Sequence, residues 1–141
     1  MSGRGTSGSG SSIVVERSGD WELVNDALGG FEDGVVREYW LDGASWVTHD
    51  DHLAEDGYPR LVVVVQLQSS SVAAVRLTFE GVRTVRYERK RDVSPAVARD
   101  ERDGWIVEFL SCCVAASSCI VEPLGSEWLG RGPFLGSDQA R

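Results

Sequence analysis

The sequence predicts an α+β fold that is mostly β: an antiparallel meander sheet of about six strands with one short N-terminal helix. The first observation is that three segments rich in β-branched residues, 61–68, 72–79 and 82–88, are separated only by a few polar or glycine residues. Connections of that length join antiparallel neighbours, because a parallel crossover needs about a dozen residues or more. The second observation is that residues 21–28 combine a helical apolar spacing with a glycine stop.

Three elements are expected before the meander. Residues 13–16 have the composition of a short edge strand. Asp20 is a plausible N-cap for the helix at residues 21–28, and the Gly-Gly pair that follows ends it, because glycine readily takes the left-handed conformation found at helix C-termini. Residues 34–41, GVVREYWL, read as a strand with imperfect alternation, which is typical of a strand partly covered on both faces.

The segment between this strand and the meander is polar and irregular. Residues 46–59, WVTHDDHLAEDGYP, follow an Asp-Gly turn signal, and we expect a long surface loop with a short helix at residues 50–55. Loops longer than about 12 residues in small domains are usually functional or disordered. This segment is therefore the first place to look for a functional site.

The meander and the segments after it complete the predicted fold. Residues 61–68 are almost continuously apolar, which predicts a central strand buried on both faces. Residues 93–102 are polar and contain a proline, so we expect them to leave the sheet. Residues 105–114 and 118–122 are expected to form a final hairpin. Residues 124–141 are expected to be a coil whose Trp128 and Phe134 cover the sheet.

Length and composition indicate one domain. The chain has 141 residues, the usual size of a single domain, and we assign residues 13–141 to one globular unit. Residues 1–12 are rich in glycine and serine, which predicts a disordered tail. They lack the apolar core of a secretory signal, and no apolar run approaches the roughly 18 residues of a membrane span. We therefore expect a cytoplasmic protein that does not enter membranes.

Three cysteines, Cys112, Cys113 and Cys119, lie close together in the sequence. The odd count and the missing secretory signal predict reduced thiols that act as small buried hydrophobes in strands. A Cys112–Cys119 disulfide across a hairpin is the alternative. The spacing matches no paired zinc-ligand pattern, and we expect no metal and no other cofactor.

Charge is distributed unevenly along the chain. The net charge of −8 disfavours nucleic acid and anionic membranes as partners. Residues 20–56 contain eleven carboxylates and a single base, Arg37, whereas residues 76–102 contain eight bases and five acids. Two interpretations are open: the two segments neutralise each other in space, or the acidic segment forms an exposed face that steers a basic partner.

Motifs for catalysis are missing. No phosphate-binding glycine loop and no nucleophile elbow is present. The best cluster is His49-Asp50-Asp51-His52, whose side chains are competent metal ligands, but its two histidines are three residues apart in an expected loop. A small metal-dependent hydrolase built on this loop is an alternative function.

A single lysine against thirteen arginines is typical of a GC-rich bacterial genome.

Two segments carry a resemblance to a known family. The stretch GGFEDGVVREYWLD at residues 29–42 resembles an F-H-D-[GS]-x-[IV]-x-E motif that precedes a strand in small bacterial domains, and residues 77–82 match a later L-x-F-x-x-V strand pair. The combination resembles polymorphic-toxin immunity proteins of immunity protein family 50 and similar small domains, over about residues 20–122. Asp33 fits the motif, but Glu32 stands where the motif has His, which puts any role of that His in doubt here. The resemblance implies a non-enzymatic cytosolic protein that binds and blocks a cognate toxin.

We therefore predict a non-enzymatic protein-binding module, with a basic toxin domain as the candidate partner and steric occlusion as the mechanism. Carboxylates supply electrostatic complementarity and exposed aromatics supply anchors, because binding energy concentrates in such residues. Ordinary core packing is the alternative for the aromatics. The predicted binding residues are Glu32, Asp33, Trp40, Trp46, Asp50, Asp51, Glu55, Asp56 and Tyr58. A structural subunit that associates with itself through a sheet edge is a further alternative.

Overall fold

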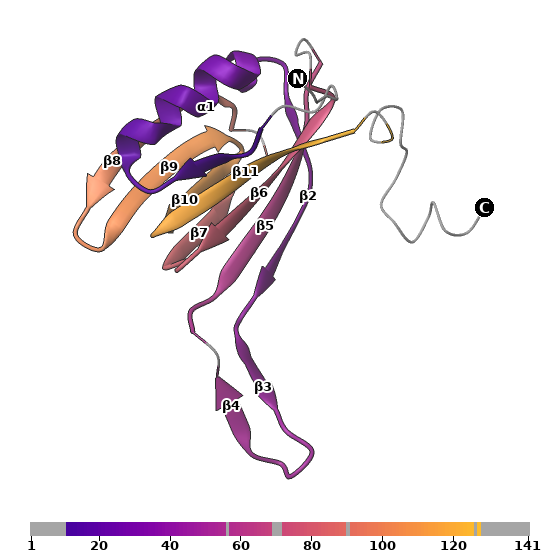
Figure 1. Ribbon diagram of the computed structural model, residues 1–141, viewed down its shortest axis with the longest axis vertical. Helices are drawn as coiled ribbons and strands as arrows, with labels where there is room; N and C mark the ends of the chain where they lie inside the picture. Colours follow the sequence, from indigo (N-terminus) through magenta and orange to yellow (C-terminus); the bar gives the residue numbers. More distant parts are fainter. Residues whose placement is uncertain (1–10, 56, 69–71, 90, 126, 128–141) are drawn as a thin grey trace.

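Two antiparallel sheets and one helix make up most of the computed structural model, which describes residues 11–55, 57–68, 72–89, 91–125 and 127 (Figure 1). The five-stranded sheet has the order β1 (Ile13–Val15), β11 (Ser118–Leu124), β6 (Ala74–Glu80), β5 (Arg60–Gln66) and β2 (Val35–Asp42). The four-stranded sheet has the order β7 (Thr84–Tyr87), β10 (Cys112–Ala116), β9 (Gly104–Leu110) and β8 (Val93–Glu101). A separate pair joins β3 (Ser45–Val47) to β4 (Leu53–Glu55). The predicted fold class, mostly antiparallel β with a short N-terminal helix, is confirmed, with eleven strands in place of about six.

The helix lies where the sequence predicts it. Helix α1 (Trp21–Leu28) follows a 3-10 turn, η1 (Ser18–Asp20), and precedes another, η2 (Gly29–Phe31). Gly29 ends it in the left-handed conformation, with φ 68°. Asp20 does not bond to the first turn of α1. Its carboxylate instead accepts bonds from the backbone N–H groups of Glu16 and Arg17, at 2.9 and 3.2 Å, and these bonds lower the pKa of the carboxyl.

The predicted meander is right for two of its strands and wrong for the third. β5 and β6 pair, with Val63 opposite Leu77, but β7 pairs with β10 in the other sheet. At Gly81, with φ 63°, the chain leaves the plane of the first sheet, and a Cβ there would lie 2.5 Å from Ser117 Oγ. In a two-sheet protein a short connection can pass from one sheet to the facing one, so connection length alone did not determine the pairing.

Residues 93–102 do not leave the sheet as predicted, since all but the last of them form edge strand β8 of the four-stranded sheet. Their polarity reflects the exposed edge, and Pro95 falls in a register shift between Val93 and Val97, where the ladder is interrupted. The backbone of Ala96 bonds instead to the helix: Asn25 Nδ2 donates to the Ala96 carbonyl oxygen, and the Ala96 N–H donates to Asn25 Oδ1, both at 2.9 Å. One side chain thereby ties α1 to the interrupted strand.

The predicted final hairpin is also wrong. Residues 105–114 are two strands, β9 and β10, which turn sharply at Leu110, with φ 50°, and Ser111. They pair with each other, with Phe109 opposite Cys112. β11 then crosses to the five-stranded sheet and lies between β6 and β1. Trp128 and Phe134 lie outside the described residues, as do residues 1–10 of the predicted tail.

An aromatic cluster fills the space between the two sheets and α1. Trp21 of the helix meets Trp105 edge-to-face at 5.4 Å between ring centroids, and it stacks on Phe79 at 6.1 Å and Phe109 at 6.2 Å. Phe31 contacts Phe109 at 5.4 Å. All five side chains are at most 1% exposed. No described helix has the length and apolar composition needed to cross a membrane.

The three thiols are free and buried, as predicted, and the alternative disulfide is not formed. Burial raises the pKa of Cys112 to about 12, with a smaller contribution from the neighbouring Cys113. Burial also raises the pKa of Cys119 well above its usual value. The Cys112 and Cys119 thiols therefore stay protonated at neutral pH.

Replacement of Asn25 by Ala should lower the free energy of unfolding by about 1–3 kcal/mol, because Ala96 would lose both bonds where the β8 ladder is already interrupted. Urea unfolding followed by tryptophan fluorescence would measure the change. Asp26→Ala, at an exposed position of the same helix, is the control and should shift stability by less than about 0.5 kcal/mol. Equal effects of the two variants would show that the Asn25 bonds contribute nothing beyond helix propensity.

Alkylation should distinguish the buried thiols from those of the unfolded chain. A pKa raised from 9.0 to about 12 lowers the thiolate fraction of Cys112 at pH 8 roughly a thousandfold. We expect iodoacetamide to label Cys112 and Cys119 slowly in the native protein and rapidly in urea, as measured by peptide mass spectrometry. Rapid native labelling of either residue would contradict the burial described above.

A candidate interaction arm

The chain between β2 and β5 forms a hairpin that projects away from the two sheets (Figure 1). We call residues 43–59 the arm. Its strands β3 and β4 pair over three residues each, with Trp46 opposite Ala54. The predicted loop with a helix at residues 50–55 is wrong, because the β-forming residues on either side of a tight turn pair with each other. No described residue of the arm is buried.

The base of the arm is defined by turn geometry. Asp42 and Arg60 are the last directly opposed residues of β2 and β5. Beyond them, Asp42 Oδ1 accepts a bond from the Ala44 N–H at 2.8 Å, and Ala44 takes a positive φ of 63°. Gly57, with φ 75°, makes the corresponding turn on the returning chain. These turns interrupt the ladder, so the arm is a separate two-stranded unit.

The tip is a tight turn closed by Thr48. The Thr48 N–H donates to the His52 carbonyl oxygen at 2.8 Å, and the Asp51 N–H donates to the Thr48 carbonyl oxygen at 3.0 Å. Thr48 Oγ1 accepts a further bond from the His52 N–H at 3.1 Å. Asp51 has φ 63°, a conformation that aspartate tolerates better than most residues. His49, Asp50 and Asp51 are therefore displayed at the end of the hairpin.

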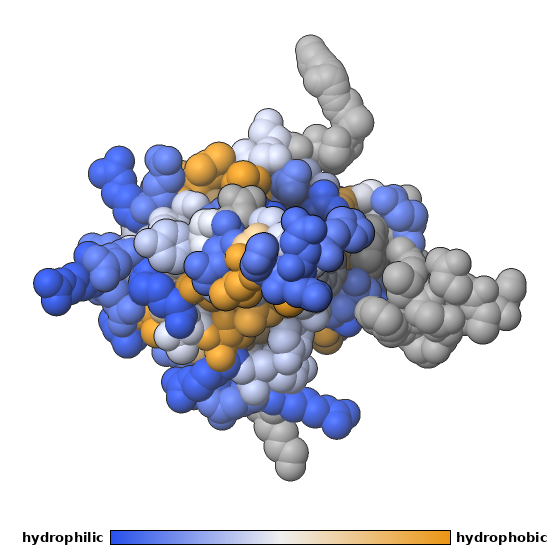
Figure 2. All heavy atoms as spheres, turned by 90° about the horizontal axis from the view of Figure 1, so that it is seen from below, coloured by the Kyte–Doolittle hydropathy of each residue, from blue (hydrophilic) through white to orange (hydrophobic). Residues whose placement is uncertain are grey.

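The arm displays large apolar side chains to solvent. Trp46 is 51% exposed, Val47 68%, Leu53 71% and Tyr58 77%. Seen from the side toward which the arm points, hydrophobic residues gather in the middle of the molecule and hydrophilic residues surround them (Figure 2). Clustered exposed apolar side chains with a polar rim are typical of protein interaction sites.

The structure brings together five of the predicted binding residues and separates the others. Trp46, Asp50, Asp51, Glu55 and Tyr58 all lie on the arm. Trp46 and Tyr58 share a small hollow of about 100 Å³ at its base, together with Asp42, Ala44 and Arg60. Asp56 lies outside the described residues.

The remaining predicted residues lie elsewhere. Trp40 lies on the outer face of the five-stranded sheet, opposite Val62, and is 48% exposed. Glu32 and Asp33 are exposed just before β2. This strand of eight residues separates them from the arm by about 25 Å. Core packing, the alternative for the aromatics, does not hold for Trp40, Trp46 or Tyr58. The sequence prediction missed Val47 and Leu53, which are also exposed on the arm. One signal was available: Trp46 and Val47 are adjacent apolar residues, and adjacent residues of a strand point to opposite faces.

The acidic and basic segments do not neutralise each other through direct ion pairs. Among the described residues, no ion pair joins an acid of residues 20–55 to a base of residues 76–102. The pairs that form are Arg37–Glu38, Arg60–Glu80, Arg76–Glu122, Arg83–Glu101, Arg91–Glu108 and Arg99–Glu101. The described carboxylates of the arm, Asp50, Asp51 and Glu55, form none of these pairs.

The metal-site alternative rested on His49 and His52. Within the described part of the chain, no three His, Cys, Asp or Glu side chains are grouped closely enough to hold a metal ion.

The alternative of self-association rested on sheet edges. β2 is an edge strand, but its register shifts between Val36 and Glu38, and such an irregularity makes an edge a poorer template for pairing.

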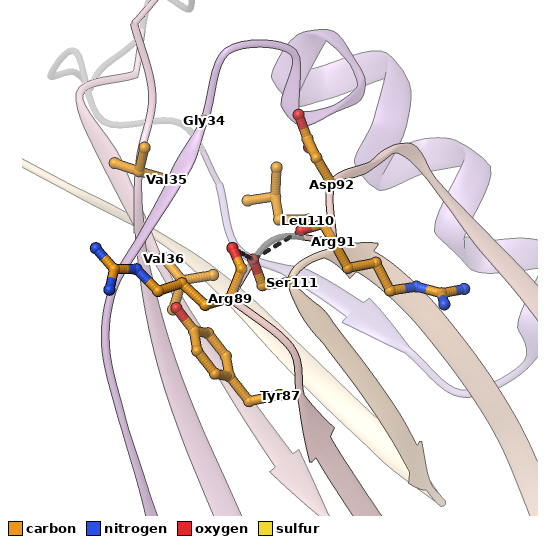
Figure 3. A pocket seen from close by; sticks show the side chains of 9 residues that line it. All are labelled: Gly34, Val35, Val36, Tyr87, Arg89, Arg91, Asp92, Leu110 and Ser111. Atoms are coloured by element: carbon orange, nitrogen blue, oxygen red, sulfur yellow. Dashed lines mark hydrogen bonds between the residues drawn. The ribbon is translucent and has the colours of Figure 1, made fainter.

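A cavity of about 300 Å³ lies at the end of the sandwich opposite the arm, between the start of β2 and the chain after β7 (Figure 3). Tyr87, whose ring stacks on Tyr39 at 5.2 Å, forms one wall, and Ser111 lies at the centre, where its hydroxyl donates to the Arg91 carbonyl oxygen at 2.9 Å. The Arg91 guanidinium turns away and pairs with Glu108. The nine lining residues are Gly34, Val35, Val36, Tyr87, Arg89, Arg91, Asp92, Leu110 and Ser111.

No family model, curated protein or solved structure matches this chain.

Replacement of Trp46 by Ala should change the free energy of unfolding by less than about 0.5 kcal/mol, because the arm contacts no buried residue cluster. Trp105→Ala, at a fully buried position, should lower it by about 3–5 kcal/mol. Urea unfolding would give both values. A loss of more than about 1 kcal/mol for Trp46→Ala would show that the arm packs on the sandwich.

Proposed function

We propose that this protein is a non-enzymatic protein-binding module that captures a basic partner with its arm. The observation that carries the proposal is the arm itself. Two three-residue strands display Trp46, Val47 and Leu53, and Tyr58 follows on the returning chain, all outside the core cluster. An isolated two-stranded hairpin is at best marginally stable in water, so a partner that buries these side chains explains why they are kept there.

The charge of the arm indicates the kind of partner. The arm, residues 43–59, contains four carboxylates, Asp50, Asp51, Glu55 and Asp56, and no lysine or arginine. A projecting group of like charges attracts an oppositely charged surface and can raise association rates roughly 10- to 1000-fold at low ionic strength. The exposed aromatics would then supply the short-range contacts that hold the complex.

In a bacterial cytoplasm, a small acidic module of this kind would act as an immunity protein, as the resemblance at residues 29–42 implies. Its arm would occlude a basic toxin domain by steric contact. Three buried, free thiols support a reducing compartment. No chemistry by the module itself is needed for this role.

The test begins with the immobilised chain and an extract of the cells from which the sequence comes, washed at low and then at high salt. We expect a single basic protein to elute at high salt. The variant D50N/D51N/E55Q should then slow association of that eluted protein about tenfold at low salt and flatten the salt dependence, measured by surface plasmon resonance.

The matched control is E16Q/E22Q/D26N, which changes the net charge by the same amount at exposed positions away from the arm. It should leave the slope of association rate against salt almost unchanged. If both triple variants slow association equally, overall charge and not the arm governs binding. An unchanged rate for the arm variant would refute the proposal.

A further inference from the structure

The two faces of the arm are both apolar. Directly paired residues share a face, so Val47 and Leu53 lie on one face, and Trp46 and Ala54 lie on the other. A β-ribbon that packs on one side alternates apolar and polar residues, whereas here the consecutive residues Trp46 and Val47 are 51% and 68% exposed. Contact with a flat surface would cover one of these faces and leave the other in water.

No other described part of the chain covers either face. Trp46 contributes to the small hollow at the base with Tyr58, and also to an open concavity with Val47, Thr48 and His49 near the tip. The sandwich offers no wall on either side, since the arm projects beyond the ends of β2 and β5 (Figure 1). Both faces are therefore accessible along the length of the hairpin.

We propose that the arm inserts into a cleft of its basic partner, so that opposite walls of the cleft cover the two faces. The inference rests on the proposed function and specifies the shape of the partner. The cleft must admit a single ribbon about 10 Å thick, the spacing of packed sheets. From Ser45 to the tip at Asp50 the arm reaches about 20 Å. Basic groups would line the deep end, where Asp50 and Asp51 arrive.

A substrate-binding cleft of a basic enzyme has this form, and an inserted arm would block it directly. The turns at Ala44 and Gly57 place the ribbon beyond the sheet edge, so that the sandwich stays outside the cleft. Asp42 and Arg60, the last pair of the sandwich, would meet the rim. This arrangement assigns separate roles to the tip charges and to the two apolar faces.

The experiment uses the protein eluted by high salt from the immobilised chain, purified and titrated against variants of the full-length chain by isothermal calorimetry. V47T/L53T removes the large apolar side chains of one face, and W46T removes the large apolar side chain of the other face. Threonine is used as the replacement because it favours β-strands, so the hairpin should still form. The matched control is V97T, because Val97 is 59% exposed but lies on edge strand β8 of the four-stranded sheet. Unchanged urea midpoints would show that each variant folds.

If the arm inserts, V47T/L53T and W46T should each weaken binding at least tenfold, and V97T less than about twofold. A loss confined to one face would overturn insertion and leave one-sided docking, with the proposed function intact. If neither face matters, or no salt-eluted protein is captured, the proposed function fails and insertion fails with it.

Discussion

The packing of Trp21 between the two sheets is the contact on which the fold depends. Its ring meets Phe79 from one sheet and Trp105 and Phe109 from the other, so one helical side chain fixes the spacing of both layers. Hydrophobic burial is the main stabilising term in a domain of this size, and these large rings supply much of it. Because the sandwich is complete without the arm, the arm is free to present apolar groups to solvent.

Charge and apolar area divide the work of recognition in the proposed complex. Carboxylates at the tip act before contact, over distances of up to about 8 Å at physiological salt, whereas the apolar faces act only once water is displaced. The ion pairs on the sheets, such as Arg60–Glu80 at 2.8 Å, satisfy their own charges and contribute little field beyond the surface. The described carboxylates of the arm, by contrast, form none of these ion pairs.

Local signals predicted the local structure well. The helix at 21–28 and its glycine stop, and the paired strands within 61–66 and 74–80, follow from periodicity and turn residues. The crossing of β7 to the second sheet depends on a clash that glycine avoids near Ser117, and β8 depends on Asn25, 71 residues from Ala96. Such distant contacts leave no local pattern. The cluster of carboxylates in the sequence predicted a candidate site on the arm and included Glu32 and Asp33 in it. Those two residues lie at the opposite end of β2, because an extended strand separates residues that are close in sequence.

The direct opposition of Asp42 and Arg60 has an evolutionary consequence. A tight turn joining these two positions would close the β2–β5 hairpin and complete the sandwich with no arm at all. Insertions, deletions and substitutions between them therefore change what is displayed without disturbing the core. Such a scaffold can change its partner quickly during evolution while its fold stays the same. This would suit a protein whose proposed partner also changes.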